Sequence, residues 1–147
     1  MTPIKRLTCV MAACVLVIAV AGCGFKSDPT PASSSDYFKW SSIETSVQPP
    51  CINVNGKLSG NMTNIDEILI ELQKAGEEAD CPGCPFQSDE EFIFSPGELG
   101  LISNSGQFKT SICPTQISSL YRMKVTAKSK YFGMPDAVSK EYFIEMP

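Results

Sequence analysis

Apolar and polar side chains alternate along much of the chain beyond residue 50, which is the period of half-buried β-strands. The clearest segments are residues 51–58, 65–73 and 121–128. Their side chains expected to face a core are Ile52, Val54, Leu58, Ile68, Ile70, Leu72, Tyr121, Met123, Val125 and Ala127. Those expected to face water are Cys51, Asn53, Asn55, Lys57, Glu67, Leu69, Glu71, Gln73, Arg122, Lys124, Thr126 and Lys128. This pattern predicts antiparallel sheets with one dry and one wet face.

Weaker alternation marks four further strands, at residues 38–47, 91–94, 106–113 and 140–145. Turn-forming residues separate the segments, among them Pro49-Pro50, Gly60-Asn61 and Pro96-Gly97. A helix over residues 65–78 is the main alternative, since Asn64 could cap one, but the β-branched residues there favour a strand. Seven short strands in about 110 residues predict an all-β, immunoglobulin-like sandwich.

The last two predicted strands resemble those of fibronectin type III modules. The matching residues are Leu120-Tyr-Arg-Met-Lys-Val-Thr-Ala-Lys-Ser, Gly133-Met-Pro and residues 139–144, with Tyr121 in the place of that family's corner tyrosine. The chain departs from the family in two ways: its single tryptophan, Trp40, does not end the strand at 51–58, and Thr115 stands where a leucine is expected. A sandwich of another lineage and an ordinary core role for Tyr121 therefore stay open.

The N-terminus has the organisation of a signal peptide, with Lys5 and Arg6 before an almost uncharged stretch over residues 7–21. Its end, Val20-Ala21-Gly22-Cys23, resembles the cleavage box of bacterial lipoproteins, although that family prefers leucine at the position of Val20. The resemblance implies that residues 1–22 are removed and that Cys23 carries acyl chains. The alternatives are a simple secretory signal and an uncleaved anchor. Gly24 after the cysteine favours an outer-membrane location facing the periplasm.

Residues 23–36 are rich in proline and serine and lack apolar periodicity, which predicts a lipidated cysteine followed by a flexible tether. The start of this segment, Cys23-Gly24-Phe25-Lys26 with Pro29 and Pro31, resembles the small lipoproteins that assist maturation of the lipopolysaccharide translocon. Ser27 and Asp28 interrupt that family's pattern, and a plain spacer is the alternative. We therefore expect a signal peptide at 1–22, a tether at 23–36 and a β-sandwich domain at 37–147.

The charge balance narrows the possible partners. Loss of Lys5 and Arg6 with the signal leaves 16 acidic residues against 10 basic ones, a net charge of −6. An acidic chain without a basic cluster is not expected to bind nucleic acid, nor to hold on to anionic lipid through basic side chains. The N-terminal lipid would therefore hold the protein on the membrane. The chain has no histidine, which excludes serine–histidine and cysteine–histidine nucleophile pairs. We expect no cofactor, no metal site and no enzymatic activity.

Four cysteines remain after the signal is removed and Cys23 is acylated: Cys51, Cys81, Cys84 and Cys113. An even number in an oxidising compartment predicts two disulfides. In this kind of sandwich the second and fifth strands lie side by side and antiparallel, so the start of one meets the end of the other. We therefore expect Cys51 to pair with Cys113, and Cys81 with Cys84.

Other arrangements of the cysteines imply other chemistry. Cys81-Pro82-Gly83-Cys84 has the spacing of a redox motif, but Pro85 follows at once and no amphipathic helix begins there. A zinc site formed by all four cysteines is a further alternative, although no second pair has the same spacing. The function expected is a lipid-anchored, non-enzymatic binding or assembly module that contacts another envelope protein. The alternative is a tethered thiol-disulfide exchange factor using Cys81 and Cys84.

Two further clusters are open to a functional or a structural interpretation. The acidic run Asp89-Glu90-Glu91 is expected to be a solvated loop, because three adjacent carboxylates on an extended segment cannot face one point. Five aromatic residues are expected to pack in the core and loops, with a binding face as the alternative: Phe86, Phe92, Phe94, Tyr131 and Phe132.

Overall fold

A computed structural model describes residues 33–75 and 84–147 of the chain, and its described part belongs to the unit Ala32–Pro147. The predicted signal peptide, Cys23, most of the tether and Cys81 lie outside these residues. In the described ranges, no helix is long and apolar enough to cross a bilayer.

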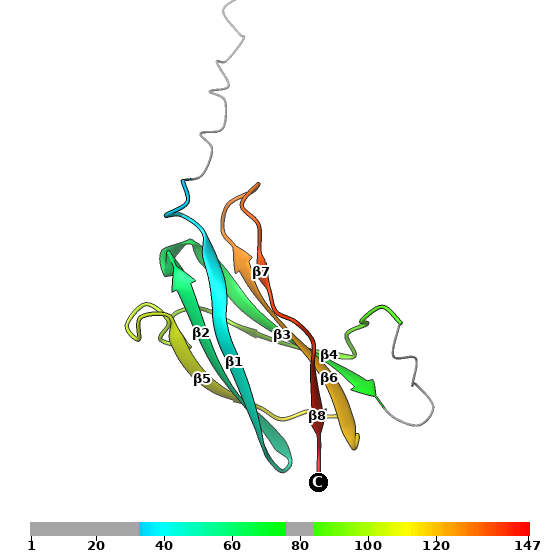
Figure 1. Cartoon of the computed structure of the whole chain (residues 1–147). Coiled ribbons are helices and arrows are strands. Elements are labelled where there is room, and N and C mark those ends of the chain that lie inside the picture. Colours follow the sequence, from blue (N-terminus) through cyan, green and yellow to red (C-terminus); the bar gives the residue numbers. More distant parts are fainter. Residues whose placement is uncertain (1–32, 76–83) are drawn as a thin grey trace, which may run out of the picture. The chain divides into compact units, whose positions relative to one another are not determined.

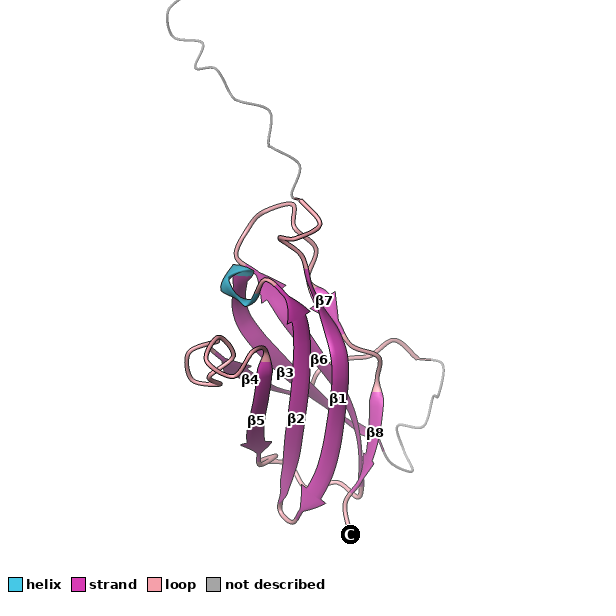
Figure 2. Ribbon diagram, turned by 60° about the vertical axis from the view of Figure 1, so that its left-hand side comes forward, coloured by secondary structure: helices cyan, strands magenta, loops and turns pink. Residues whose placement is uncertain are grey.

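The described residues form two antiparallel sheets packed face to face (Figures 1 and 2). One sheet has the order β1-β2-β5, and the other has the order β4-β3-β6-β7, with β8 also paired to β6. The elements are β1 (Phe38–Gln48), β2 (Cys51–Gly60), the 3-10 helix η1 (Met62–Asn64), β3 (Ile65–Ala75), β4 (Glu90–Phe94), β5 (Gln107–Ile112), β6 (Leu120–Ser129), β7 (Ala137–Val138) and β8 (Tyr142–Glu145). The predicted all-β sandwich is confirmed, and residues 65–75 are a strand rather than a helix.

The predicted last strand is divided into β7 and β8, which both pair antiparallel with β6. Ser139 lies between them, and its backbone N–H donates to the Val125 carbonyl at 2.9 Å. The Ser139 hydroxyl then takes the place of a backbone acceptor, because it accepts a hydrogen bond from the Val125 N–H at 2.9 Å. This side-chain bond interrupts the ladder, so the strand expected from residue 140 starts earlier and in two pieces.

The core lies between the two sheets and contains every side chain that the alternation predicted to face inward. The prediction was wrong for three residues expected to face water: Leu69, Arg122 and Thr126 are buried on the opposite side of their sheet. The segment after Cys84 covers Arg122 through the Cys84 carbonyl and the Phe86 ring, a contact that alternation along one strand cannot reveal.

A disulfide joins Cys51 to Cys113 across 62 residues of sequence. Its position follows from the register of β2 and β5, because Ile52 pairs with Ile112 and the cysteines come next along each strand. The bridge therefore joins neighbouring strands of one sheet, at the end of the domain where β1 turns into β2. A covalent link closing a loop of this length contributes about 4 kcal/mol by restricting the unfolded chain.

A tight contact between Gly56 and Phe108 shapes the inner face of the three-stranded sheet. Gly56 pairs with Phe108 in the β2–β5 register. A Cβ atom added at Gly56 would lie 2.2 Å from the Phe108 ring, so the ring occupies the space of a side chain. Trp40 packs edge-on against the same ring with centroids 6.1 Å apart, and its indole Nε1 donates to the Ala137 carbonyl of β7 at 2.8 Å. These contacts close one side of the sandwich.

The connection into β6 is held by Tyr121 and Glu90. The buried Tyr121 hydroxyl donates to the Gln116 carbonyl, five residues upstream, which is the geometry of a tyrosine corner. The Glu90 carboxylate accepts from the backbone N–H groups of Thr115 and Gln116, both at 2.9 Å. Burial opposes ionisation of Glu90, but these two hydrogen bonds outweigh it and lower the pKa of the carboxyl below its usual 4.5. Glu90 is thus a structural cap rather than part of a loose acidic loop.

We predict that Gly56→Ala destabilises the domain by about 1–3 kcal/mol, because the added methyl group overlaps the Phe108 ring and forces the core to shift. Chemical denaturation measures the change in the free energy of unfolding. Gly97→Ala is the matched control, since the nearest atom to its added Cβ is 3.9 Å away. Equal effects of the two substitutions would show that Phe108 does not fill the space beside Gly56.

We predict that Glu90→Gln lowers stability by about 1 kcal/mol near neutral pH, because a neutral amide cannot accept from both N–H groups. Since the folded-state pKa of Glu90 is lowered, its contribution is present above about pH 4.5 and is lost as the pH falls through the folded value. The difference between the two proteins should therefore shrink in acid. Denaturation at a series of pH values tests this, with the exposed neighbour Glu91→Gln as control, and a pH-independent difference would contradict it.

Candidate functional site: the outer face of the five-stranded sheet

The surface of the five-stranded sheet that is turned away from the core, called here the outer face, is ordered in rows across the strands. The register places Ile93 beside Leu69, Leu69 beside Thr126, and Thr126 beside Val138. An apolar row therefore crosses the whole sheet from β4 to β7. Its two ends, Ile93 and Val138, are each 58% exposed, while the two central side chains are buried.

Paired charges border the apolar row on both sides. On one side, the Lys128 ammonium lies 2.9 Å from the Glu67 carboxylate, and this hydrogen bond raises the pKa of Lys128. On the other side, Lys124 lies 3.0 Å from Glu71. Each pair joins β6 to β3, so opposite charges neutralise one another on the face. These ion pairs leave a surface that combines a dry stripe with fixed, mutually satisfied charges.

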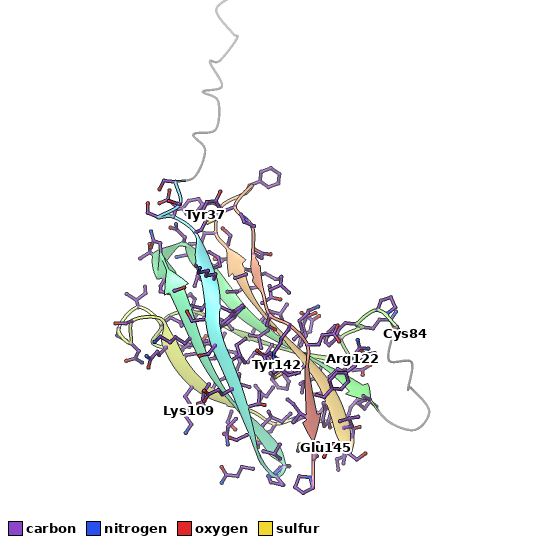
Figure 3. All side chains as sticks on the ribbon, viewed as in Figure 1. Tyr37, Cys84, Lys109, Arg122, Tyr142 and Glu145 are labelled. Carbon is purple, nitrogen blue, oxygen red and sulfur yellow. A yellow bond between two sulfur atoms is a disulfide. The ribbon has the colours of Figure 1, made fainter. Side chains whose placement is uncertain are left out.

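Arg122 is hydrogen-bonded to three other segments on the part of the outer face beyond Lys124. Its Nη2 and Nε donate to Glu141 at 2.6 and 3.1 Å, and its Nη1 donates to Gln73 at 3.1 Å. Nη2 also donates to the Cys84 carbonyl at 3.3 Å, so a buried guanidinium holds the segment after Cys84 against the sheet (Figure 3). These partners satisfy the guanidinium and offset part of the cost of removing its charge from water.

The aromatic ring of Phe86 lies over two cationic side chains on this part of the outer face. Its ring centroid lies 4.3 Å from the Lys124 ammonium and 5.7 Å from the Arg122 guanidinium. The segment is further fixed by Gln87, whose N–H donates to Gln73 at 3.2 Å. Phe143, which pairs with Arg122 in the register, is 64% exposed. Ile93, Val138 and Phe143 are therefore the exposed apolar side chains of the outer face, called here the apolar trio.

The opposite surface, on the three-stranded sheet, carries a shallow hollow of about 760 Å³. Its polar lining comes from all three strands and includes Ser42, Glu44, Asn55, Lys57, Gln107 and Lys109. Figure 3 shows Lys109 on this sheet, on the other side of the sandwich from Arg122. The hollow offers hydrogen-bonding groups without an exposed apolar anchor, so it is less suited to hold a protein partner than the outer face.

The predicted site residues are distributed as follows. Cys51 and Cys113 form their bridge at one end of the domain. Cys84 is exposed and disulfide-bonded, whereas its predicted partner Cys81 and the lipidated Cys23 lie outside the described residues. No group of three or more potential metal-ligating side chains occurs in the part of the chain that the structure describes. Thiol-disulfide exchange through Cys81 and Cys84 stays a hypothesis from the sequence.

The acidic run and the aromatic residues have separate roles. Asp89 accepts from the Lys74 N–H at 2.7 Å, Glu90 caps the connection into β6, and Glu91 is exposed on the outer face. Phe92 and Phe94 pack against the core as predicted. The packing prediction was wrong for Tyr131 and Phe132, which are exposed in the β6–β7 loop.

Sequence reasoning did not identify the apolar trio. Ile93 carried a signal that could have found it, because it is an apolar residue in the water-facing phase between Phe92 and Phe94. Val138 and Phe143 carried none, since their phase depends on the break at Ser139.

Comparisons with known proteins show the fold but no family. No model of a known protein family matches the chain. No curated protein matches it either. Among solved structures, the chain is similar to the crystal structure of a DUF3823 family protein from Bacteroides ovatus, at 14% identity and a TM-score of 0.54, over 74% of this chain and 55% of that one. The chain thus spans about half the length of that protein, and a likeness at this identity concerns the fold alone.

Proposed function

We propose that this chain is a lipid-anchored protein of the bacterial cell envelope that binds a partner protein through the outer face and has no enzymatic activity. The observation that carries the proposal is the apolar trio of Ile93, Val138 and Phe143, exposed on one sheet face and bordered by satisfied ion pairs. The three side chains come from β4, β7 and β8, with ion pairs between and beside them, and exposed apolar side chains set among polar groups are typical of surfaces that bind proteins.

The support for anchoring is the N-terminal pattern Val20-Ala21-Gly22-Cys23. Nine residues lie between Cys23 and Ser33, where the described chain begins, and these ten residue-to-residue steps allow a reach of up to about 35 Å when extended. In this proposal the protein is held at the periplasmic side of the outer membrane, and the tether lets the outer face reach another envelope protein.

The support for a binding role rather than catalysis comes from how the acidic side chains are used. Glu67, Glu71 and Glu141 are committed to ion pairs with β6. Glu90 caps a connection, and Glu98 accepts from the Ser95 N–H at 2.7 Å at a turn. These groups stabilise the fold, and the chain supplies no histidine to act beside them as a general base.

We predict that Cys23→Ala abolishes membrane attachment. The wild-type protein should float with membrane vesicles, and the mass of its mature chain should exceed that of residues 23–147 by the mass of its acyl chains. The substituted protein should lack this added mass and lose flotation. A wild-type chain that carries no added mass would contradict lipidation and support the secretory signal or the uncleaved anchor instead.

We predict that a photoreactive benzoylphenylalanine in place of Ile93 forms a discrete cross-linked product with one envelope protein in living cells. The same group in place of Lys109, on the opposite sheet, is the matched control and should give no such product. Val138→Lys should reduce the product about tenfold, since charging a contact residue costs about 1–2 kcal/mol. Ser111→Lys, on the three-stranded sheet, should leave it unchanged. Equal cross-linking from positions 93 and 109 would contradict binding through the outer face.

A further inference from the structure

The β6–β7 loop presents two aromatic side chains to solvent at its tip. Phe132 is fully exposed and Tyr131 is 57% exposed. Gly133 follows in the left-handed region with φ of 89°, and a Cβ added there would meet no atom within 4 Å, so the tip is surrounded by open space. Large aromatic side chains are costly to leave in water, and their exposure at a projecting tip indicates a contact beyond the domain itself.

The loop is held in a defined shape by hydrogen bonds on both of its sides. The Ser129 N–H donates to Asp136 at 2.8 Å, which closes the base of the loop. The Met134 N–H donates to the Tyr131 carbonyl at 3.1 Å, which forms the turn at the tip. The Met134 side chain packs against the core. The two aromatic residues are therefore displayed by a braced loop.

The same end of the domain receives the chain from the predicted lipid anchor, and Asn64 connects the two. The Asn64 side-chain amide donates to the Asp36 carbonyl at 2.8 Å, while its backbone carbonyl accepts from the Lys130 N–H at 3.0 Å. The Lys130 ammonium also donates to the Thr63 carbonyl at 2.9 Å. Both views show the start of the described chain and the β6–β7 loop at one end of the sandwich (Figures 1 and 2), and Tyr37 lies there as well (Figure 3).

We infer that Tyr131 and Phe132 insert into the headgroup region of the membrane to which Cys23 is anchored. A tyrosine such as Tyr131 suits this interface because its ring lies among apolar groups while its hydroxyl stays in water. A phenylalanine such as Phe132 places its apolar ring at the boundary between the headgroups and the acyl chains. The stretch between Cys23 and Ser33 limits how far the tip can move from the bilayer, which raises the local concentration of the tip at the membrane surface, so a contact too weak to hold a free protein becomes populated. This inference rests on the lipid anchoring of the proposed function.

Insertion of the loop would fix the orientation of the sandwich on the membrane. The strands of the sandwich run between the end with the β6–β7 loop and the end with the β1–β2 turn, as Figure 1 shows, and the Cys51–Cys113 bridge lies beside that turn. Insertion of the tip therefore sets the strands upright on the bilayer and leaves the apolar trio facing sideways, accessible to a neighbouring envelope protein.

The test places an indole at the tip. Phe132→Trp and Ile117→Trp are prepared in the full chain and reconstituted in vesicles of phosphatidylethanolamine and phosphatidylglycerol that contain phospholipids brominated in their acyl chains. Ile117 is the matched control, because it is 97% exposed in the connection between β5 and β6, at the opposite end of the sandwich. The emission of wild-type Trp40 is subtracted from both.

The added emission of F132W should fall about twofold in the brominated vesicles, because interfacial side chains enter roughly 5–10 Å into the bilayer, and that of I117W should not change. Absence of quenching in F132W when the chain floats with the vesicles, or equal quenching of both variants, overturns the inference.

A second arm separates this result from the failure of lipidation. Residues 23–147 with an N-terminal polyhistidine tag are held on vesicles of the same lipids supplemented with a nickel-chelating lipid. Quenching of F132W in this arm supports the loop contact even if the natural chain carries no acyl group, in which case only the anchoring by Cys23 is wrong. Absence of quenching in this arm, together with flotation of the natural chain, overturns the loop contact and leaves the proposed function standing.

Discussion

β3 and β6 pair antiparallel along almost their whole length, and the side chains that this register sends inward are among the most deeply buried of the domain. Ile68, Ile70, Met123 and Val125 each have no exposed surface. A slip of either strand by one residue would turn that strand's inward side chains to water and bring a charged neighbour inside, Glu71 in β3 or Lys124 in β6, at a cost comparable with the whole stability of a domain. The register is thus the constraint on which the other features depend.

The outer face is a product of the same register. The Glu67–Lys128 and Glu71–Lys124 pairs lie across neighbouring strands, and the apolar row between them is continuous because Leu69 and Thr126 are opposed. Arg122 extends this order beyond the strands, since its hydrogen bonds hold the segment after Cys84 on the sheet. Core and surface are therefore specified by a single set of strand pairings.

Much of the fold could be predicted from the sequence because alternation is a local signal. The polar neighbours of Ile52 and Val54 indicate that these two side chains face the core. The expected pairing of the second and fifth strands likewise placed Cys51 beside Cys113. What could not be predicted depends on contacts between distant segments. Arg122 is buried by partners 19 to 49 residues away, and the break at Ser139 comes from its side-chain bond to β6. Tyr131 and Phe132 lie outside any periodic segment, so their sequence contains no indication of direction.

The position of the Cys51–Cys113 bridge has a mechanical consequence. Tension on the N-terminal tether first meets the hydrogen bond between Asp36 and Asn64 and is then borne by the ladder between β1 and β2. If β1 were pulled away, the load would reach Cys51 and pass through the sulfur atoms directly to Cys113. Residues 52–112, which include β2, β3, β4 and β5, would carry none of it. For a protein held at a membrane by one end, the bridge confines any stretching of the fold to β1 and to the strands that follow Cys113.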